Sequence, residues 1–253
     1  MSLAIKKIFP NFYKLSKKTI NQIPVKTTLW DRKVYNVNFG VRKMINLWKN
    51  NELREEANYV YESYNGGDFI DIGAFSGFYS FLLSPKANNH DNFISCEPDI
   101  NAQSELFLNL SILKKNFKNI NFSTVTHPIS NGKEVIIAHD DWGHPCFLDY
   151  NQAGKNNKKT QKKFKSITID NLVGSLSLEP TFIKIDTEGA EFDVFEGMKD
   201  TMKKFKPKIM LEKHPTMLPK SISLKDIDEI LKNNNYKANL INESKLAIRE
   251  IWE

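Results

Sequence analysis

The sequence predicts an α/β fold in which a mostly parallel sheet carries helices on both faces. Short apolar segments alternate with longer segments of helical periodicity, and no internal repeat or long linker interrupts them. The composition agrees with this prediction. The 253 residues are 40% hydrophobic and 26% charged, which suits a globular chain and excludes a disordered tail, a collagen or a coiled-coil rod.

The first half of the chain begins with a predicted helix over residues 51–64, where apolar residues recur on one face. A strand at 68–72 runs into a glycine turn. The helix expected at 75–83 stops before Pro85, because the residue preceding a proline disfavours helical dihedral angles. The elements expected next are a strand at 92–96, a helix at 101–116, and strands at 120–125 and 133–138.

The second half repeats the alternation of strand and helix. Its predicted strands cover residues 182–185, 208–211, 238–241 and 246–251, and its predicted helices cover 190–205 and 224–233. Ligands of such sheets bind beyond the carboxyl ends of the strands. The residues just after each strand are therefore the candidates for a functional site.

A glycine-rich turn follows the strand at 68–72 and reads DIGAFSGFYS over residues 71–80. Gly73 and Gly77 permit a tight turn and the close approach of a ligand. The free N–H groups at the start of the next helix favour an anionic ligand group such as a carboxylate. The turn lacks the third glycine of the dinucleotide motif, which favours a nucleoside without phosphates.

Glu97 lies just past the strand at 92–96, about 20 residues after Gly77, where an acidic side chain can accept hydrogen bonds from both ribose hydroxyls. Asp71, at the end of the first strand, can hold an ammonium group. A carboxylate, an ammonium and a ribose occur together in S-adenosylmethionine, which is the predicted cofactor. The alternative is a glycine turn that merely connects a strand to a helix.

Three carboxylates follow the strand at 182–185, in the segment that reads IKIDTEGAE. Asp186, Glu188 and Glu191 crowd one strand end, and such crowding can raise the pKa of a carboxyl group as a general base requires. They can equally bind a cation or a substrate hydroxyl. The alternative is helix capping, which is weighed equally with function for Glu191, whereas function is favoured for Asp186.

One histidine lies at a predicted strand end, and two others lie in less regular segments. His214 follows the strand at 208–211 and can take a proton near neutral pH, although a lone histidine is often structural. His127 follows the third strand and is a candidate for an adenine pocket. His144 follows Trp142 in a segment that either closes over a substrate or forms an ordinary polar turn.

Several of these segments resemble the FkbM-type family of S-adenosylmethionine-dependent methyltransferases. They are Asp71–Ser80, Glu97-Pro98, Thr168–Leu172, Leu211–Pro215 and, most specifically, Ile183–Met198, which reads IKIDTEGAEFDVFEGM. The resemblance covers roughly Glu55 to His214. It implies a Rossmann-like class I methyltransferase fold with a seven-stranded sheet and an antiparallel last strand. It also implies O-methylation, often of a sugar or natural-product hydroxyl. The family commonly has Asn in place of Phe75, so no polar cofactor contact is carried over there.

The predicted site divides into three groups of residues. The candidates for the catalytic base are, in order, His214, Asp186 and His144. The predicted substrate-binding residues are Glu188, Glu191 and Trp142. No metal is predicted, because no ligand spacing is diagnostic. The predicted cofactor-binding residues are Asp71, Gly73, Ala74, Phe75, Gly77, Phe78, Glu97, Pro98 and His127.

Two regions are expected along the chain: a basic leader and extension at residues 1–50, packed on a methyltransferase domain at residues 51–253. The leader lacks the unbroken apolar centre of a secretory signal, and no segment reaches the length of a membrane span. Two distant cysteines, Cys96 and Cys146, favour a reducing cytoplasm. Contact of the basic leader with a membrane surface is an alternative to its packing on the domain.

The formal charge of +6 suits an anionic small-molecule or glycan acceptor. The lysine-rich stretch at 155–165 is either an electrostatic contact for such a partner or a solvated loop. The alternative functions are an RNA methyltransferase and a non-catalytic nucleoside-binding module. Against RNA, no strand has the aromatic and basic pattern that stacks bases. The oligomeric state is left open.

Overall fold

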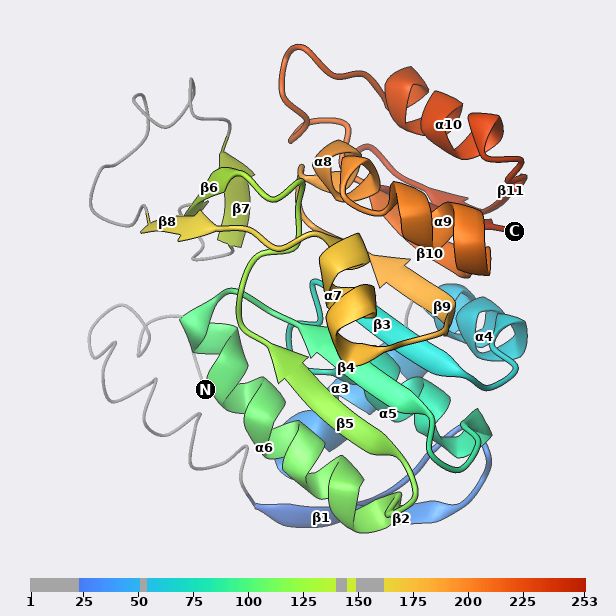
Figure 1. The fold of residues 1–253 in the computed structure, drawn as a ribbon. Helices are drawn as coiled ribbons and strands as arrows, with labels where there is room; N and C mark the ends of the chain where they lie inside the picture. The colour runs from blue at the N-terminus through green and yellow to red at the C-terminus, as the bar shows by residue number, and fades with distance from the viewer. Residues whose placement is uncertain (1–22, 51–53, 140–144, 149–161) are drawn as a thin grey trace.

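A seven-stranded sheet is the centre of the fold in a computed structural model that describes residues 23–50, 54–139, 145–148 and 162–253 (Figure 1). The strand order is β11-β12-β10-β9-β3-β4-β5. The strands are β3 (Asp68–Ile72), β4 (Asn92–Cys96), β5 (Asn121–Val125), β9 (Pro180–Ile185), β10 (Lys208–Lys213), β11 (Ala238–Glu243) and β12 (Ile248–Trp252). Neighbours from β10 to β5 are parallel, whereas β12 is antiparallel to both β10 and β11. The expected seven strands and antiparallel last strand are confirmed.

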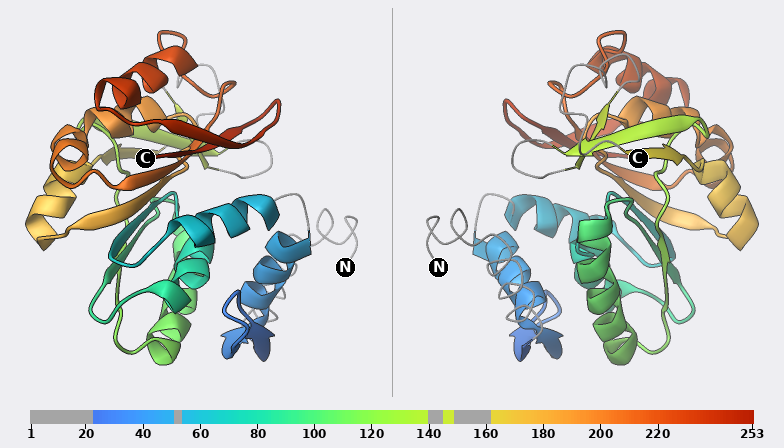
Figure 2. Two further views of the ribbon diagram at one scale, coloured as in Figure 1. Left: turned by 90° about the vertical axis from the view of Figure 1, so that its right-hand side faces the viewer. Right: turned by 90° about the vertical axis from the view of Figure 1, so that its left-hand side faces the viewer.

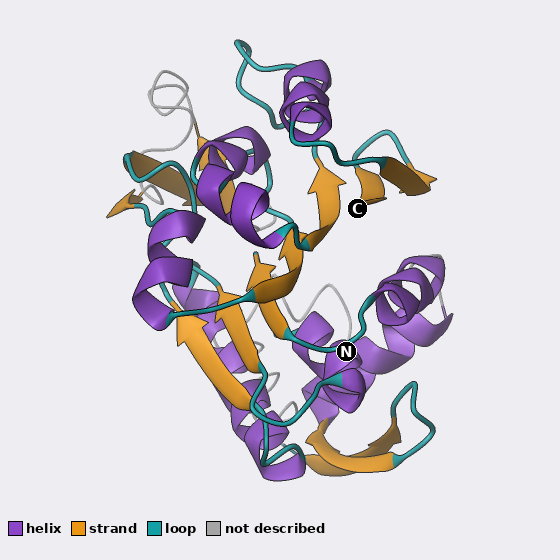
Figure 3. Ribbon diagram, turned by 45° about the vertical axis from the view of Figure 1, so that its right-hand side comes forward, coloured by secondary structure: helices purple, strands orange, loops and turns teal. Residues whose placement is uncertain are grey.

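Helices cover both faces of this sheet, as predicted (Figures 2 and 3). One group packs with Phe69, and the other packs with Ile70, because successive strand residues point to opposite faces. The first group is α3 (Phe39–Asn50), α4 (Arg54–Ser63), α5 (Phe78–Leu83) and α6 (Ile100–Asn116). The second group is α7 (Ile169–Leu176), α8 (Glu191–Glu196), α9 (Lys199–Phe205) and α10 (Leu224–Asn233). A short 3-10 turn, η1 (Ser84–Lys86), follows α5.

Two predicted elements differ from the structure. The helix expected at 190–205 is divided into α8 and α9 at Gly197, whose α-carbon lies so near another segment that a Cβ there would stand 2.3 Å from the Ser130 carbonyl oxygen. The strand expected at 133–138 exists as β6 (Glu134–His139), but it lies outside the central sheet. It pairs antiparallel with β7 (Pro145–Leu148) and β8 (Lys162–Lys165) in a small separate sheet.

The N-terminal extension contributes to the core of the domain. Strands β1 (Pro24–Thr28) and β2 (Val34–Asn38) form an antiparallel hairpin that leads into α3. Leu29, Val37 and Ile45 join the same buried cluster as the aromatic residues of α5. The predicted leader before residue 23 lies outside the described residues. Within the described ranges, no helix is both long enough and apolar enough to span a membrane.

The lysine-rich stretch at 155–165 falls partly within the described residues. Residues 155–161 lie outside the described part of the chain, and the last four residues form β8. On that strand, Lys163 lies 3.0 Å from Glu134 in an exposed ion pair. Exposed pairs of this kind contribute little to stability.

Candidate active site

The carboxyl ends of β3, β4 and β9 border a cavity of about 330 Å³. Ligands of such sheets bind beyond the carboxyl ends of the strands, so this cavity lies where the site is expected. Six of the predicted cofactor-binding residues line the cavity: Gly73, Ala74, Phe75, Phe78, Glu97 and Pro98. Asp186 and Glu188 line it as well, so the two motifs that are far apart in sequence meet in one cavity.

The glycine turn is packed directly against the end of β9. Gly73 has a φ of +77°, and a Cβ there would stand 1.8 Å from the carbonyl oxygen of Asp186. The N–H groups of Gly73 and Ala74 both donate to the Cys96 carbonyl oxygen at 3.0 Å. Gly77, with a φ of +81°, lies against the side chain of Leu106 and does not line the cavity. The turn therefore needs glycine at 73 for a backbone contact, which also fixes where β9 ends.

Glu97 is held in place by two backbone donors. Its Oε2 accepts a hydrogen bond from the N–H of Phe75, and its Oε1 accepts one from the N–H of Asp99, both at 2.8 Å. The side chain is 4% exposed, and this burial raises its pKa to about 7. Each carboxylate oxygen retains a further acceptor position. The group is thus oriented and can still bind hydroxyls in the cavity.

Asp71 lies beneath the cavity rather than on its wall. It is fully buried, its oxygens make no hydrogen bond among the described residues, and burial raises its pKa to about 6. The ammonium of Lys184 lies 3.9 Å from Asp71 and donates to Oδ2 of Asp186 at 2.9 Å and to the Gly73 carbonyl oxygen at 3.0 Å. Lys184 was not predicted. The signal for it was a lysine just before the last residue of the apolar strand β9.

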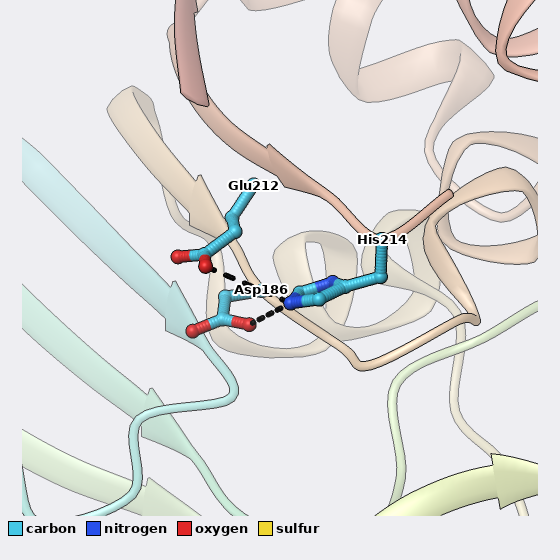
Figure 4. A group of neighbouring side chains, drawn as sticks. All are labelled: Asp186, Glu212 and His214. Carbon is cyan, nitrogen blue, oxygen red and sulfur yellow. Dashed lines mark ion pairs between the residues drawn. The ribbon is translucent and has the colours of Figure 1, made fainter. Parts of the chain in front are cut away.

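His214 is surrounded by carboxylates at the end of β10 (Figure 4). Its Nδ1 lies 2.9 Å from Oε1 of Glu191, while its Nε2 lies 3.6 Å from both Glu212 and Glu188 and 3.8 Å from Asp186. Burial opposes a charge on the ring, but these carboxylates outweigh it and raise the pKa of His214 to about 10. With nothing else bound, the ring is therefore protonated at neutral pH and cannot accept a further proton.

Glu212 joins this cluster and was not assigned a role from the sequence. It is 8% exposed and pairs with the guanidinium of Arg249 on β12. Arg249 also contacts Glu56 of α4 at 2.9 Å, and Glu56 in turn accepts a hydrogen bond from the hydroxyl of Tyr79. Helices α4 and α5 are thereby joined to the strand end that carries His214. The available signal for Glu212 was a charged residue inside β10, where every residue after Lys208 is buried.

The remaining predicted residues are placed as follows. Glu191 is fully buried and contacts His214 and the N–H of Gly189, whereas Glu188 is partly exposed on the cavity wall. His127 is exposed and lines a second cavity of about 440 Å³, which shares Pro98 and Ile137 with the first. Trp142 and His144 lie outside the described residues.

One wall of the main cavity comes from the N-terminal extension. Trp48 of α3 lines the cavity and stacks on Phe78, with ring centroids 4.2 Å apart. No sequence pattern places Trp48 in the site, because Trp48 precedes the glycine turn by more than one element.

Comparison with protein families matches residues 71–238 to the methyltransferase FkbM domain. Among solved structures, the methyltransferase FkbM of Methylobacillus flagellatus is 16% identical with a TM-score of 0.50, over 99% of this chain and 60% of that chain. Trm5b of Pyrococcus abyssi is 12% identical with a TM-score of 0.46, over 92% of this chain and 56% of that one. The chain thus spans less than two thirds of the length of either protein. No curated protein matched the chain.

Proposed function

Since the chain belongs to the FkbM family of S-adenosylmethionine-dependent methyltransferases, we propose that it methylates a hydroxyl of a sugar, glycan or related small molecule. The observation that carries this proposal is the meeting of two motifs in one cavity: the Gly73 turn with Glu97, and the strand end with Asp186. When bound, S-adenosylmethionine supplies a methyl group whose carbon–sulfur bond breaks, with the electron pair left on sulfur, as the new carbon–oxygen bond forms.

The residues on the β3–β4 side of the cavity fit a nucleoside. Glu97 presents a carboxylate that two backbone donors orient, which suits the paired hydroxyls of a ribose. Ile129, Ile137 and Pro98 give the cavity an apolar wall of the kind that an adenine ring packs against. Lys184, pinned between Asp186 and the Gly73 carbonyl, keeps the two strand ends in register below the ligand.

The residues on the β9–β10 side fit a hydroxyl acceptor. Asp186 is anchored through Oδ2 on Lys184, while its buried Oδ1 has no hydrogen-bond partner in the described structure. An acceptor hydroxyl would satisfy that oxygen. Glu188 faces the same cavity from a left-handed turn, with a φ of +54°. We therefore assign Asp186 and Glu188 to hydroxyl binding and proton removal, since the protonated ring of His214 cannot take the proton.

Methyl transfer to an oxygen tests this proposal. The full chain would be incubated with methyl-labelled S-adenosylmethionine and a panel of monosaccharides, charged glycans and RNA, and the products analysed by mass spectrometry. The proposal expects labelled methyl ethers on saccharide hydroxyls. Labelled RNA with unlabelled saccharides would replace it with the RNA alternative. Tight cofactor binding without any transfer would favour a non-catalytic nucleoside-binding module.

A further inference from the structure

We propose that Asp186, Glu212 and His214 form a binding site for one divalent metal ion, which in turn holds the acceptor hydroxyl. The geometry alone places the ion at the ends of β9 and β10. Its role toward a hydroxyl rests on the proposed function.

The spacing of the three side chains suits an ion between them better than direct contacts. One ligand atom from each lies within 4.8 Å of the other two. Nε2 of His214 is 3.6 Å from Glu212 and 3.8 Å from Asp186, which is too long for a hydrogen bond. Two ligand atoms on one ion, with bonds of about 2.1 Å at angles between a right angle and a straight line, stand roughly 3–4 Å apart, and the two distances from His214 fall in this range. Figure 4 shows both carboxylates aimed at the same ring nitrogen.

His214 is buried, and one of its ring nitrogens makes no hydrogen bond in the described structure. The side chain is 6% exposed, yet among the described residues no partner of Nε2 lies within hydrogen-bond distance. The other nitrogen, Nδ1, is fixed by the fully buried Glu191, which is itself held by the Gly189 N–H at 3.0 Å. A carboxylate behind the histidine is the usual support of a metal-binding imidazole, because it fixes the ring and points its free nitrogen at the ion.

The negative charge around the imidazole ring of His214 also favours the binding of a cation. Asp186, Glu188, Glu191 and Glu212 all lie within 4 Å of His214. In the described structure, the cations that contact members of this group are Lys184 and Arg249, which are shared with Asp71 and Glu56. A proton on the imidazole offsets one negative charge. A divalent ion offsets two and leaves the ring neutral, as a metal ligand must be.

The donors and their position indicate what the ion does. One imidazole nitrogen with two carboxylates suits Mn²⁺ and related divalent ions better than a soft, thiolate-bound metal. Three protein ligands leave coordination positions open, and Asp186 lies on the wall of the cavity. A hydroxyl bound at an open position has a lowered pKa, and its proton can pass to the carboxylate of Glu188 on the same wall.

Binding of Mn²⁺ to the full chain tests the site directly. After treatment with a chelator and buffer exchange, the chain would be titrated with Mn²⁺ and the free ion followed by electron paramagnetic resonance. One ion per chain is expected. Glu212→Gln and His214→Ala should each weaken binding at least tenfold. Asp228→Asn is the matched control, since Asp228 pairs with Lys213 rather than with the cluster and should leave binding unchanged.

Folding and function are separated from metal binding by two further measurements. Mn²⁺ should raise the melting temperature of the wild-type chain and of Asp228→Asn, but not that of folded Glu212→Gln. S-adenosylhomocysteine binding would be measured by calorimetry on the same samples. Uptake of that nucleoside with no uptake of Mn²⁺, or equal Mn²⁺ affinity in Glu212→Gln and wild type, would overturn the metal site and leave the proposed function standing. Mn²⁺ binding without nucleoside uptake would support the site and remove the proposed function.

Discussion

Nδ1 of His214 lies 2.9 Å from Oε1 of Glu191, so the residue that follows β10 is tied to the first residue of α8. The contact fixes which edge of the imidazole faces the cavity. It also joins two of the motif segments, Ile183–Met198 and Leu211–Pro215, which helix α9 separates in the sequence. The position of Nε2 among Asp186, Glu188 and Glu212 follows from this one buried contact.

Glu191→Gln should lower the pKa of His214 from about 10 toward the ordinary value for histidine, because the amide no longer stabilises the imidazolium. The pKa would be followed by NMR of the ring protons in metal-free protein. Asp193→Asn, on the same helix and hydrogen-bonded to Asn131, is the control and should change nothing. An unshifted His214 in Glu191→Gln would contradict this account of the ring.

His214→Ala should reduce methyl transfer by about 10²-fold or more, because the variant loses a ligand of the metal ion proposed to hold the acceptor hydroxyl. The affinity for S-adenosylhomocysteine should change little, because His214 does not line the cavity beside Glu97. Turnover assays and calorimetric titrations of the same preparation check the expected loss of activity and the expected retention of nucleoside binding. Near-normal turnover would show that Asp186 and Glu188 act without the histidine.

Glu97→Ala should weaken S-adenosylhomocysteine binding by about 1–3 kcal/mol, the contribution of hydrogen bonds to a charged group. Because Glu97 also receives the N–H groups of Phe75 and Asp99, Glu97→Gln is the milder companion variant. Glu105→Gln, on α6 and away from both cavities, is the control. Wild-type affinity in Glu97→Ala would remove Glu97 from the site.

The affinity for S-adenosylhomocysteine should rise as the pH increases through about 7, where burial holds the pKa of Glu97. The charged carboxylate accepts hydrogen bonds from hydroxyls better than the protonated one. The stability of the unliganded protein changes with pH in the opposite direction. Because folding raises the pKa of Glu97, its contribution to the free energy of unfolding is fully present below the pKa of the unfolded chain and is lost as the pH rises through about 7. Calorimetry from pH 5.5 to 8.5 checks the slope, which Glu97→Gln should abolish.

Gly73→Ala should destabilise the fold severely. The strained φ alone costs roughly 1–3 kcal/mol, and the added methyl group would overlap the carbonyl oxygen of Asp186. Gly174→Ala is the matched control, because that helical position has no atom near the added carbon, and alanine there should stabilise by up to about 1 kcal/mol. Chemical denaturation compares the two. Wild-type stability in Gly73→Ala would contradict the backbone contact described here.

Strand ends were predictable because they are local features. An apolar run followed by a glycine or an acid, as at Ile72-Gly73 and Cys96-Glu97, specifies both the strand and the side chain beyond it. The site residues found only in the structure depend on long-range packing. Lys184 and Arg249 lie inside strands, and their partners Asp71 and Glu56 come from distant elements.

The errors in element prediction have similar causes. Helix α7 is absent from the sequence prediction, although Thr168 caps it by accepting the N–H of Asn171. The sequence predicts β6 as a strand without assigning its sheet, and its partners β7 and β8 come from the segments that follow it. Periodicity identifies a strand, but it does not identify the sheet to which the strand belongs.

The most direct test of the central claim is calorimetric titration of the full wild-type chain with S-adenosylhomocysteine. The account expects one molecule bound per chain, in a cavity between Gly73 and Glu97, with binding weakened in Glu97→Ala and retained in Glu105→Gln. A folded wild-type chain that shows no heat of binding at millimolar nucleoside would contradict it.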